Sequence, residues 1–223
     1  MRQLFDDWPV TYDQWFATPI GRLVKKVEGE LLLDFIKPKP GDFILDAGCG
    51  TGVFTLDLLH LGCPIIGIDL SMPMLLRAKQ KARGYPFRIV LADLLSLPFS
   101  ENSFDKVISV TALEFIEDGR GAIDELFRVT KRGGSLVVAT LNSLSPWALQ
   151  RKAEARQKHT IFERAIFRSP EELLSLTQIH GEIRTAIHFR KEENPELAPG
   201  IEQEGFEKRL NTGAFLAARW VKP

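Results

Sequence analysis

Short apolar runs of strand length recur along the first two thirds of the chain. They lie at residues 43–47, 64–68, 87–92, 104–110 and 135–141. Several of the segments between them carry apolar side chains every three to four positions, as an amphipathic helix packed on a sheet does. This alternation predicts a parallel sheet with helices on both of its faces.

Both ends of the chain extend this pattern. Residues 19–36 carry apolar side chains at helical spacing, and Pro19 suits the first turn of a helix. Residues 182–189 and 213–220 are predicted to be a sixth and a seventh strand. The segment between them, residues 190–212, is charged and contains two prolines, so we expect a surface loop there.

The most specific motif follows the first predicted strand, in the order Asp46-Ala47-Gly48-Cys49-Gly50-Thr51-Gly52. Glycines at the end of a strand permit a tight turn and let the backbone approach a ligand. The free N–H groups in the first turn of the next helix then face that ligand. The glycine spacing G-x-G-x-G differs from the G-x-G-x-x-G fingerprint of dinucleotide sites.

An acid stands at the end of each of the first three predicted strands: Asp46, Asp69 and Asp93. Ligands of open α/β sheets bind at these carboxyl ends, where an acid can accept hydrogen bonds from ribose hydroxyls. The usual alternative for such an acid is a helix cap, but Ser71 is the better cap for the helix after Asp69. The three acids therefore predict a nucleoside site at this edge.

These residues resemble the class I S-adenosylmethionine (SAM)-dependent methyltransferases, in particular the methyltransferase type 11, UbiE-like branch that acts on small molecules. The resemblance is close over residues 12–140 and looser over residues 165–220. It implies a Rossmann-like, seven-stranded, mostly parallel sheet with helices on both faces. The last strand is expected to be antiparallel and inserted between strands five and six, and an N-terminal helical extension is expected ahead of the sheet.

The resemblance implies SAM as cofactor, S-adenosylhomocysteine as its product, and in-line transfer of the methyl group to a small-molecule acceptor at O, N or C. It sets Asp46 and the glycine loop beside the methionine half of SAM, Asp69 beside the ribose and Asp93 beside the adenine amino group. The expected cofactor-binding residues are Asp46, Gly48, Cys49, Gly50, Asp69, Leu70, Met74, Asp93, Leu94, Thr111, Tyr12, Trp15 and Arg22.

Residues 1–37 are expected to form a helical lid ahead of the core fold. Its aromatic side chains are Phe5, Trp8, Tyr12, Trp15 and Phe16. Aromatic faces attract a sulfonium as they attract other cations, which favours a lid over the cofactor. The alternative is a hydrophobic patch that docks this segment on the sheet.

Two charged residues have two interpretations each. Arg22 can pair with the methionine carboxylate of the cofactor, or it is a solvated helix residue. Glu114 follows the fourth strand and is the nearest candidate for a general base. Its alternative role is that of a cap or of a partner for a backbone N–H.

Residues 142–168 are expected to form a helical insertion on the substrate side of a single domain that spans residues 1–223. This insertion holds the densest basic cluster of the chain, made of Arg151, Lys152, Arg156 and Lys158. The cluster is either a solvated helix face or a docking surface for an acidic substrate.

Composition narrows the classes of partner. Lys+Arg and Asp+Glu both number 29, so the net charge of zero offers no general attraction to nucleic acid or to a membrane surface. No apolar run approaches the roughly 18 residues of a membrane span. Cys49 and Cys63 lack a metal-binding spacing, so we expect no metal. We expect a cytoplasmic protein, monomeric or homodimeric, with a small-molecule substrate.

Two other functions are consistent with a Rossmann-like sheet. A nicotinamide-dependent oxidoreductase requires a glycine spacing and a proton relay that we do not find in the sequence. A SAM-binding protein without catalysis has the same cofactor motifs and differs only on the acceptor side. The glycine spacing and the third acid favour the methyltransferase.

Overall fold

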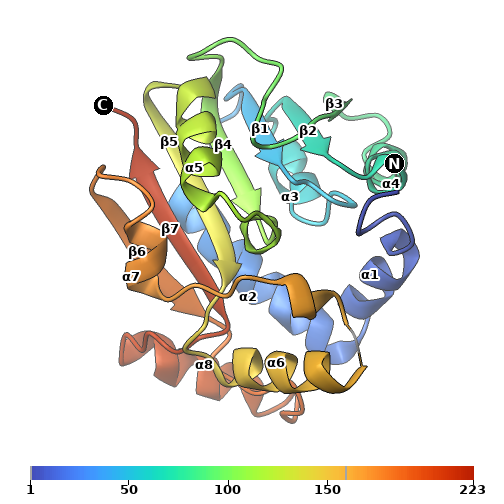
Figure 1. The fold of residues 1–223 in the computed structure, drawn as a ribbon, viewed down its shortest axis with the longest axis vertical. Helices are drawn as coiled ribbons and strands as arrows, with labels where there is room; N and C mark the ends of the chain where they lie inside the picture. Colours follow the sequence, from blue (N-terminus) through green and yellow to red (C-terminus); the bar gives the residue numbers. More distant parts are fainter. Residues whose placement is uncertain (1, 159) are drawn as a thin grey trace.

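The computed structural model describes residues 2–158 and 160–223, with the backbone alone for residues 156–158. Its centre is a seven-stranded sheet of order β3-β2-β1-β4-β5-β7-β6 (Figure 1). The strands are β1 (Ile44–Ala47), β2 (Ile65–Asp69), β3 (Phe87–Leu91), β4 (Phe104–Val110), β5 (Thr130–Leu141), β6 (Gly181–Ala186) and β7 (Phe215–Val221).

The topology confirms the fold that the resemblance implies. Strands β1 to β5 are parallel to one another, and β7 is antiparallel to both β5 and β6, between which it lies. The carboxyl ends of β1, β2, β3 and β4 therefore meet at one edge of the sheet. Any site built from these strand ends draws on segments that are far apart in the sequence.

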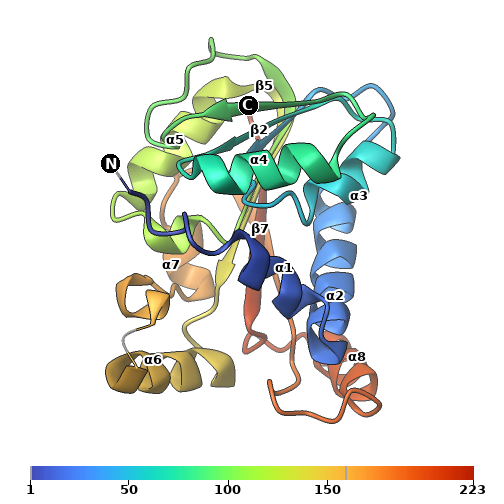
Figure 2. The same cartoon turned by 90° about the vertical axis from the view of Figure 1, so that its right-hand side faces the viewer.

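Helices cover both faces of the sheet, and Figure 1 shows α5 in front of it and α2 behind it. The helices are α1 (Pro9–Phe16), α2 (Pro19–Ile36), α3 (Thr55–His60), α4 (Met72–Lys81), α5 (Gly119–Val129), α6 (Pro146–Lys158), α7 (Pro170–Leu174) and α8 (Ala198–Glu207), with 3-10 turns η1 (Leu113–Phe115) and η2 (Ile161–Arg164). Figure 2 shows α1 beside α2 and below α4.

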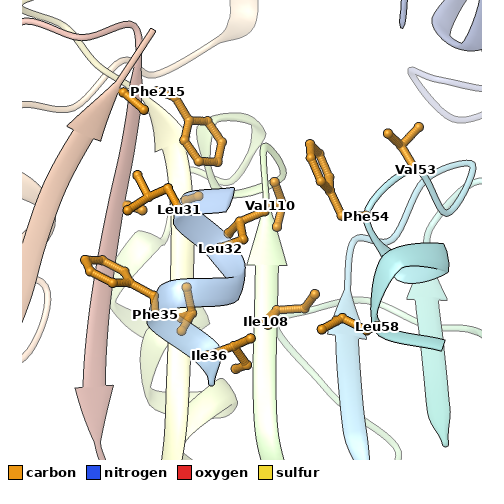
Figure 3. Close-up of a cluster of buried hydrophobic side chains, with 14 of the residues drawn as sticks. Leu31, Leu32, Phe35, Ile36, Val53, Phe54, Leu58, Ile108, Val110 and Phe215 are labelled. Atoms are coloured by element: carbon orange, nitrogen blue, oxygen red, sulfur yellow. The ribbon is translucent and has the colours of Figure 1, made fainter. Parts of the chain in front are cut away.

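Two apolar clusters, one on each face of the sheet, form the core. Successive residues of β1 alternate between them: Ile44 belongs to the cluster under α2 and α3, and Leu45 to the cluster under α5. This alternation follows from the two-residue period of a strand. In the first cluster, α2 directs its apolar side chains toward Ile108 and Val110 of β4 (Figure 3).

Helix α2 begins and ends where the sequence predicts. The hydroxyl of Thr18 accepts a hydrogen bond from the Gly21 N–H at 3.0 Å, and Pro19 occupies the first turn. Its apolar stripe is buried, with Phe35 fully shielded from solvent. Residues 2–37 thus have two parts: α2 belongs to the core, whereas the segment that ends with α1 lies over the strand ends.

The loop that we predicted over residues 190–212 is wrong, because α8 occupies Ala198–Glu207. The two prolines that suggested a loop do not prevent a helix, since Pro199 stands in the first turn, where no backbone N–H is required. Gly205 lets the helix lie directly on the ring of His188, because a Cβ at this position would collide with that ring. The Glu202 carboxylate accepts backbone N–H groups from Ile187 and His188 at 3.0 and 2.6 Å.

Other predicted bounds shift by a few residues. The strand predicted at residues 135–141 extends back to Thr130 as β5, and its pairing with β4 changes register between Phe104 and Lys106. Helix α7 begins with a capping box, in which the Ser169 hydroxyl accepts from the Glu172 N–H and the Glu172 carboxylate accepts from the Ser169 N–H.

The position of α2 in the core predicts a large loss of stability when its central ring is removed. Phe35→Ala should lower the free energy of unfolding by about 3–5 kcal/mol, the range for deletion of a buried aromatic side chain. Denaturant unfolding followed by circular dichroism measures this change. Phe206→Ala on α8 is the control, because this ring is 57% exposed, and its effect should stay within about 0.5 kcal/mol. A similarly small effect for Phe35→Ala would contradict the assignment of α2 to the core.

Candidate active site

Two adjoining cavities lie at the carboxyl edge of the sheet. The first, of about 150 Å³, is built from the ends of β1 to β4 and the loops that follow them. The second, of about 270 Å³, lies between α1, α2, η1 and α6. Four residues line both cavities and so form the wall between them: Phe5, Tyr12, Thr111 and Phe115.

Most of the predicted site residues line the first cavity. They are Asp46, Gly48, Cys49, Gly50, Asp69, Leu70, Met74, Asp93, Leu94, Thr111 and Tyr12. Trp15 and Glu114 line the second cavity instead. Arg22 lines neither cavity, because it lies on the exposed side of α2, where its guanidinium donates to the Ala17 carbonyl.

The structure also adds residues that the sequence did not predict at a site. Phe54 and Ala112 line the first cavity, and Glu28 lines the second. The sequence does carry a signal for Glu28. It stands four residues after Val24 and three before Leu31, in the stripe of α2 that faces the core.

The glycine loop lies close under the first cavity. Gly48 has a φ of 78°, a backbone conformation that side chains disfavour. A Cβ at Gly48 would also collide with the Ala112 Cβ. The N–H groups of Gly48 and Cys49 both donate to the Ile68 carbonyl, at 2.9 and 2.8 Å, so the loop is fixed to the end of β2. Burial raises the pKa of the Cys49 thiol well above its usual value, which keeps the thiol protonated.

Asp69 connects the glycine loop to α4. One carboxylate oxygen accepts from the Gly50 N–H at 2.9 Å, and the other accepts from the Ser71 N–H at 2.8 Å. The side chain of Ser71 caps α4 by accepting from the Met74 N–H, as predicted. Each oxygen of Asp69 keeps lone-pair capacity toward the cavity, because a carboxylate accepts up to about four hydrogen bonds.

The other two acids of the strand ends have different surroundings. Asp46 is buried and accepts a hydrogen bond of 2.6 Å from the Thr55 hydroxyl. Burial, reinforced by the nearby charge of Asp69, outweighs this bond and raises the pKa of Asp46 to about 7. Asp93 is exposed at the mouth of the cavity and accepts from the Leu95 N–H at 2.9 Å.

Thr111, in the wall between the cavities, has a strained backbone. Its φ of 50° lies in the left-handed region, where a β-branched residue costs of order 1–3 kcal/mol. Its N–H donates to the Ala139 carbonyl at 2.9 Å, and its side chain is a hydrogen-bond partner of the Tyr12 hydroxyl. The neighbouring strand and α1 therefore hold this residue in place.

Asp13 fastens α1 to the core of the site. One of its oxygens accepts from the Thr51 hydroxyl at 2.7 Å and from Lys81 at 2.9 Å, and the other accepts from Arg77 at 2.8 Å. Burial alone would raise the pKa of Asp13, but these three hydrogen bonds outweigh it and hold the pKa below its usual value. The ion-pair network connects the segment over the cavities to both the glycine loop and α4.

The second cavity combines aromatic walls with five ionisable groups, those of Glu114, Arg151, Glu28, Tyr12 and Lys191. The aromatic residues that line it, besides those shared with the first cavity, are Trp8, Trp15, Phe16, Trp147 and Phe162. Glu114 accepts a hydrogen bond from the Thr140 hydroxyl at 3.0 Å, and burial raises its pKa to about 7. The guanidinium of Arg151 lies over the rings of Trp147 and Phe162, at 5.1 and 4.8 Å from their centroids.

Glu28 is a further ionisable group of the second cavity. Its side chain is 8% exposed, and it makes no hydrogen bond or ion pair with any residue that the structure describes. Burial, with a smaller contribution from Glu114, raises its pKa to about 8 against the opposing influence of Arg151.

The basic cluster predicted on the insertion does not act as one surface. Arg151 faces the second cavity, whereas Lys152 is exposed and lies over the ring of Phe167 at 5.3 Å. The side chains of Arg156 and Lys158 lie outside the described residues.

The described residues contain no group of three or more His, Cys, Asp or Glu side chains arranged to hold a metal ion. Among the helices built from them, none is both long and apolar enough to cross a membrane.

The sequence is similar to those of known methyltransferases. Residues 45–138 match the family model described as "Methyltransferase domain". A demethylmenaquinone methyltransferase of Beutenbergia cavernae is 35% identical over 148 residues, which cover 65% of this chain and 59% of that protein. A malonyl-[acyl-carrier protein] O-methyltransferase of Buchnera aphidicola is 37% identical over 119 residues, which cover 53% of this chain and 47% of that protein. The chain spans about half the length of the curated relatives it matches.

A solved structure has a similar fold over nearly the whole chain. It is a SAM-dependent methyltransferase of Thermotoga maritima, described as a possible histamine N-methyltransferase, and it covers 98% of both chains with a TM-score of 0.71. The sequence identity is 22%, so this likeness concerns the fold alone.

The contacts of Asp13 predict that one isosteric substitution loosens α1. Asp13→Asn should lower the free energy of unfolding at pH 7 by about 1–2 kcal/mol, because buried hydrogen bonds to a charged group contribute about 1.5–3 kcal/mol and water screens part of this effect. Backbone amides of Pro9–Phe16 should exchange faster with solvent in the variant. The control is Asp7→Asn in the same segment, whose exposed partner is Arg2.

The effect of Asp13→Asn should also depend on pH. Because the folded-state pKa of Asp13 lies below the unfolded value of 3.8, the carboxylate stabilises the fold above that value, and this stabilisation is lost as the pH falls through the folded pKa. The difference between wild type and variant should therefore be full at pH 7 and shrink below pH 3.8. If the free energies of unfolding of wild type and variant differed equally at pH 7 and at about pH 2.5, the charge of Asp13 would not be the cause of the difference.

Proposed function

We propose that this chain is a class I SAM-dependent methyltransferase, which binds SAM in the first cavity and transfers the methyl group to a small-molecule acceptor in the second. One observation carries the proposal. Eleven of the thirteen residues that the resemblance assigns to SAM come from four strand ends, the segments that follow them and α1, and these eleven line a single cavity. That cavity shares a wall with a larger, aromatic one.

The residues of the first cavity suit the parts of SAM. Asp69, with lone pairs free beside its two backbone bonds, accepts the ribose hydroxyls. Asp93 receives the adenine amino group, and Leu70 and Met74 lie beside it as apolar neighbours. Asp46 and Gly48 line the cavity on the side proposed for the methionine half. When bound, SAM supplies a methyl group activated by its positively charged sulfur.

The wall between the cavities positions the reaction. Phe5, Tyr12 and Phe115 offer aromatic faces, which attract a sulfonium. Since the leaving group is a neutral thioether, alignment of acceptor and methyl group supplies most of the catalysis. The segment of residues 2–18 excludes water from both cavities, which is the role we propose for it as a lid.

Glu114 is our candidate for the residue that takes a proton from the acceptor. Its pKa of about 7 lies near physiological pH, where a general base works best. It lines the second cavity beside Phe115, a residue of the shared wall. The hydrogen bond from Thr140 fixes one of its two oxygens and leaves the other available.

A small acceptor suits the second cavity better than a macromolecule. Its walls include eight aromatic residues and lie behind α1, α2 and α6. The curated relatives are named for demethylmenaquinone and for malonyl-[acyl-carrier protein], so the sequence similarity favours no single acceptor. A net charge of zero gives no reason to propose nucleic acid or membrane as a partner.

The cofactor assignment is tested by calorimetry. The protein should bind SAM and S-adenosylhomocysteine and should not bind NAD. Asp69→Ala should weaken SAM by about 1.5–3 kcal/mol, the scale of hydrogen bonds to a charged group. Asp105→Ala is the matched control, because Asp105 also accepts a backbone N–H, from Phe43 at 3.0 Å, but lines neither cavity. Unchanged affinity in folded Asp69→Ala would remove the ribose role.

Methyl transfer itself is tested with isotopically labelled SAM. Incubation with a metabolite extract should release S-adenosylhomocysteine and yield a product whose mass carries the labelled methyl group. If the protein binds SAM but no extract supports release of S-adenosylhomocysteine, the non-catalytic SAM-binding protein is the better interpretation. Mass spectrometry of the products also identifies the acceptor.

A further inference from the structure

Glu28 is a buried carboxyl without a partner, and it lies in the wall of the acceptor cavity. Its side chain is only 8% exposed, and it makes no hydrogen bond or ion pair within the described part of the chain. Burying such a group without compensation is costly. An unmatched polar group in a cavity wall indicates a ligand that supplies the missing partner.

We propose that the acceptor cavity takes a small amine with an apolar body, whose ammonium group pairs with Glu28. This inference rests on the proposed function, because it assigns the second cavity to the methyl acceptor. It concerns the recognition of the acceptor and leaves open which of its atoms receives the methyl group.

The charges around the cavity favour a cation over an anion. Glu28 of α2 and Glu114 of η1 are the two acids, and Arg151 of α6 is the unpaired base. Tyr12 of α1 is neutral, because burial raises its pKa. Lys191 also lines the cavity, but it lies 3.8 Å from Glu154, which balances its charge. Above pH 8, where both acids are ionised, the cavity carries one net negative charge, which an ammonium group neutralises.

Arg151 does not take the place of that ammonium. In the described structure its guanidinium forms no ion pair within 4.0 Å, and it lies over the rings of Trp147 and Phe162 instead. A guanidinium over an aromatic face is already partly stabilised there. An anionic ligand that came to Arg151 would meet the repulsion of both Glu28 and Glu114.

The walls of the cavity suit the rest of an amine. Trp8, Trp15 and Phe16 offer aromatic faces, to which ammonium groups and rings both bind well. An apolar cavity of about 150 Å³ is enough to hold benzene. The acceptor cavity has about 270 Å³, so a ring with a short alkylamine chain fits inside it.

Binding of an amine should depend on pH through Glu28. In the empty cavity its pKa is about 8, because of burial and of Glu114. Below that pH the carboxyl is protonated and must lose its proton before it pairs with an ammonium. Affinity should therefore rise with pH toward the pKa of Glu28 and fall again where the amine itself loses its proton.

Three ligands of similar shape test the charge preference. They are 2-phenylethylamine, 2-phenylethanol and phenylacetate, added to the full chain in the presence of saturating S-adenosylhomocysteine. Three of the four tryptophans, Trp8, Trp15 and Trp147, line the acceptor cavity, so quenching of tryptophan fluorescence reports binding. At pH 8 the amine should bind about tenfold or more tightly than the alcohol, and the acid should bind weakest.

Glu28→Gln keeps the shape of the side chain and removes its charge. This variant should weaken 2-phenylethylamine by about 10- to 100-fold, leave 2-phenylethanol unchanged and abolish the rise of affinity with pH. Its melting temperature at pH 8 should equal or exceed that of wild type, which shows that the variant is folded. Glu30→Gln, on the exposed side of the same helix beside Lys26, should change nothing.

Two results overturn the inference: equal or tighter binding of the alcohol or the acid in wild type, or an unchanged affinity for the amine in folded Glu28→Gln. Neither result affects the proposed function if S-adenosylhomocysteine still binds and labelled SAM still yields product. Conversely, selective binding of the amine that depends on Glu28 supports the inference even if no methyl transfer is found, and the proposed function alone then fails.

Discussion

The site depends on the two hydrogen bonds that the Asp69 carboxylate accepts from the Gly50 and Ser71 N–H groups. These bonds join the glycine loop after β1 to the start of α4 after β2, although the two segments are separate in sequence. The loop can lie so close because Gly48 has no side chain to strike Ala112. Once this junction is made, the remaining strand ends form the walls of the first cavity around it.

The N-terminal segment adds the roof of both cavities to this junction. Asp13 connects α1 to Thr51 of the glycine loop and to Arg77 and Lys81 of α4. Tyr12, one residue away, reaches the wall that the two cavities share. Because neighbouring residues of one helix both anchor it and line the site, displacement of α1 opens both cavities together.

Much of the fold could be predicted because it is set by local patterns. Strands β1 to β5 each contain a short apolar run, and α2 carries its own start signals in Thr18 and Pro19. α8 was missed because its stability comes from contacts with distant residues, such as the fit of Gly205 against His188, which no local pattern reveals. The many charged residues of segment 190–212 are typical of a surface loop, so the sequence predicted a loop there.

The same distinction applies to the site. Asp46, Asp69 and Asp93 could be predicted to meet, because parallel strands bring their ends to one edge. The positions of Arg22 and Trp15 depend on the direction in which α1 and α2 run, which sequence spacing does not give.

The buried acid Glu28 has a further consequence. Leu or Met at this position would complete the apolar stripe of α2 and remove an unpaired acid, so laboratory evolution for heat resistance alone would be drawn to replace it. Such a replacement would raise the stability of the fold and lower the selectivity of the cavity for its ligand.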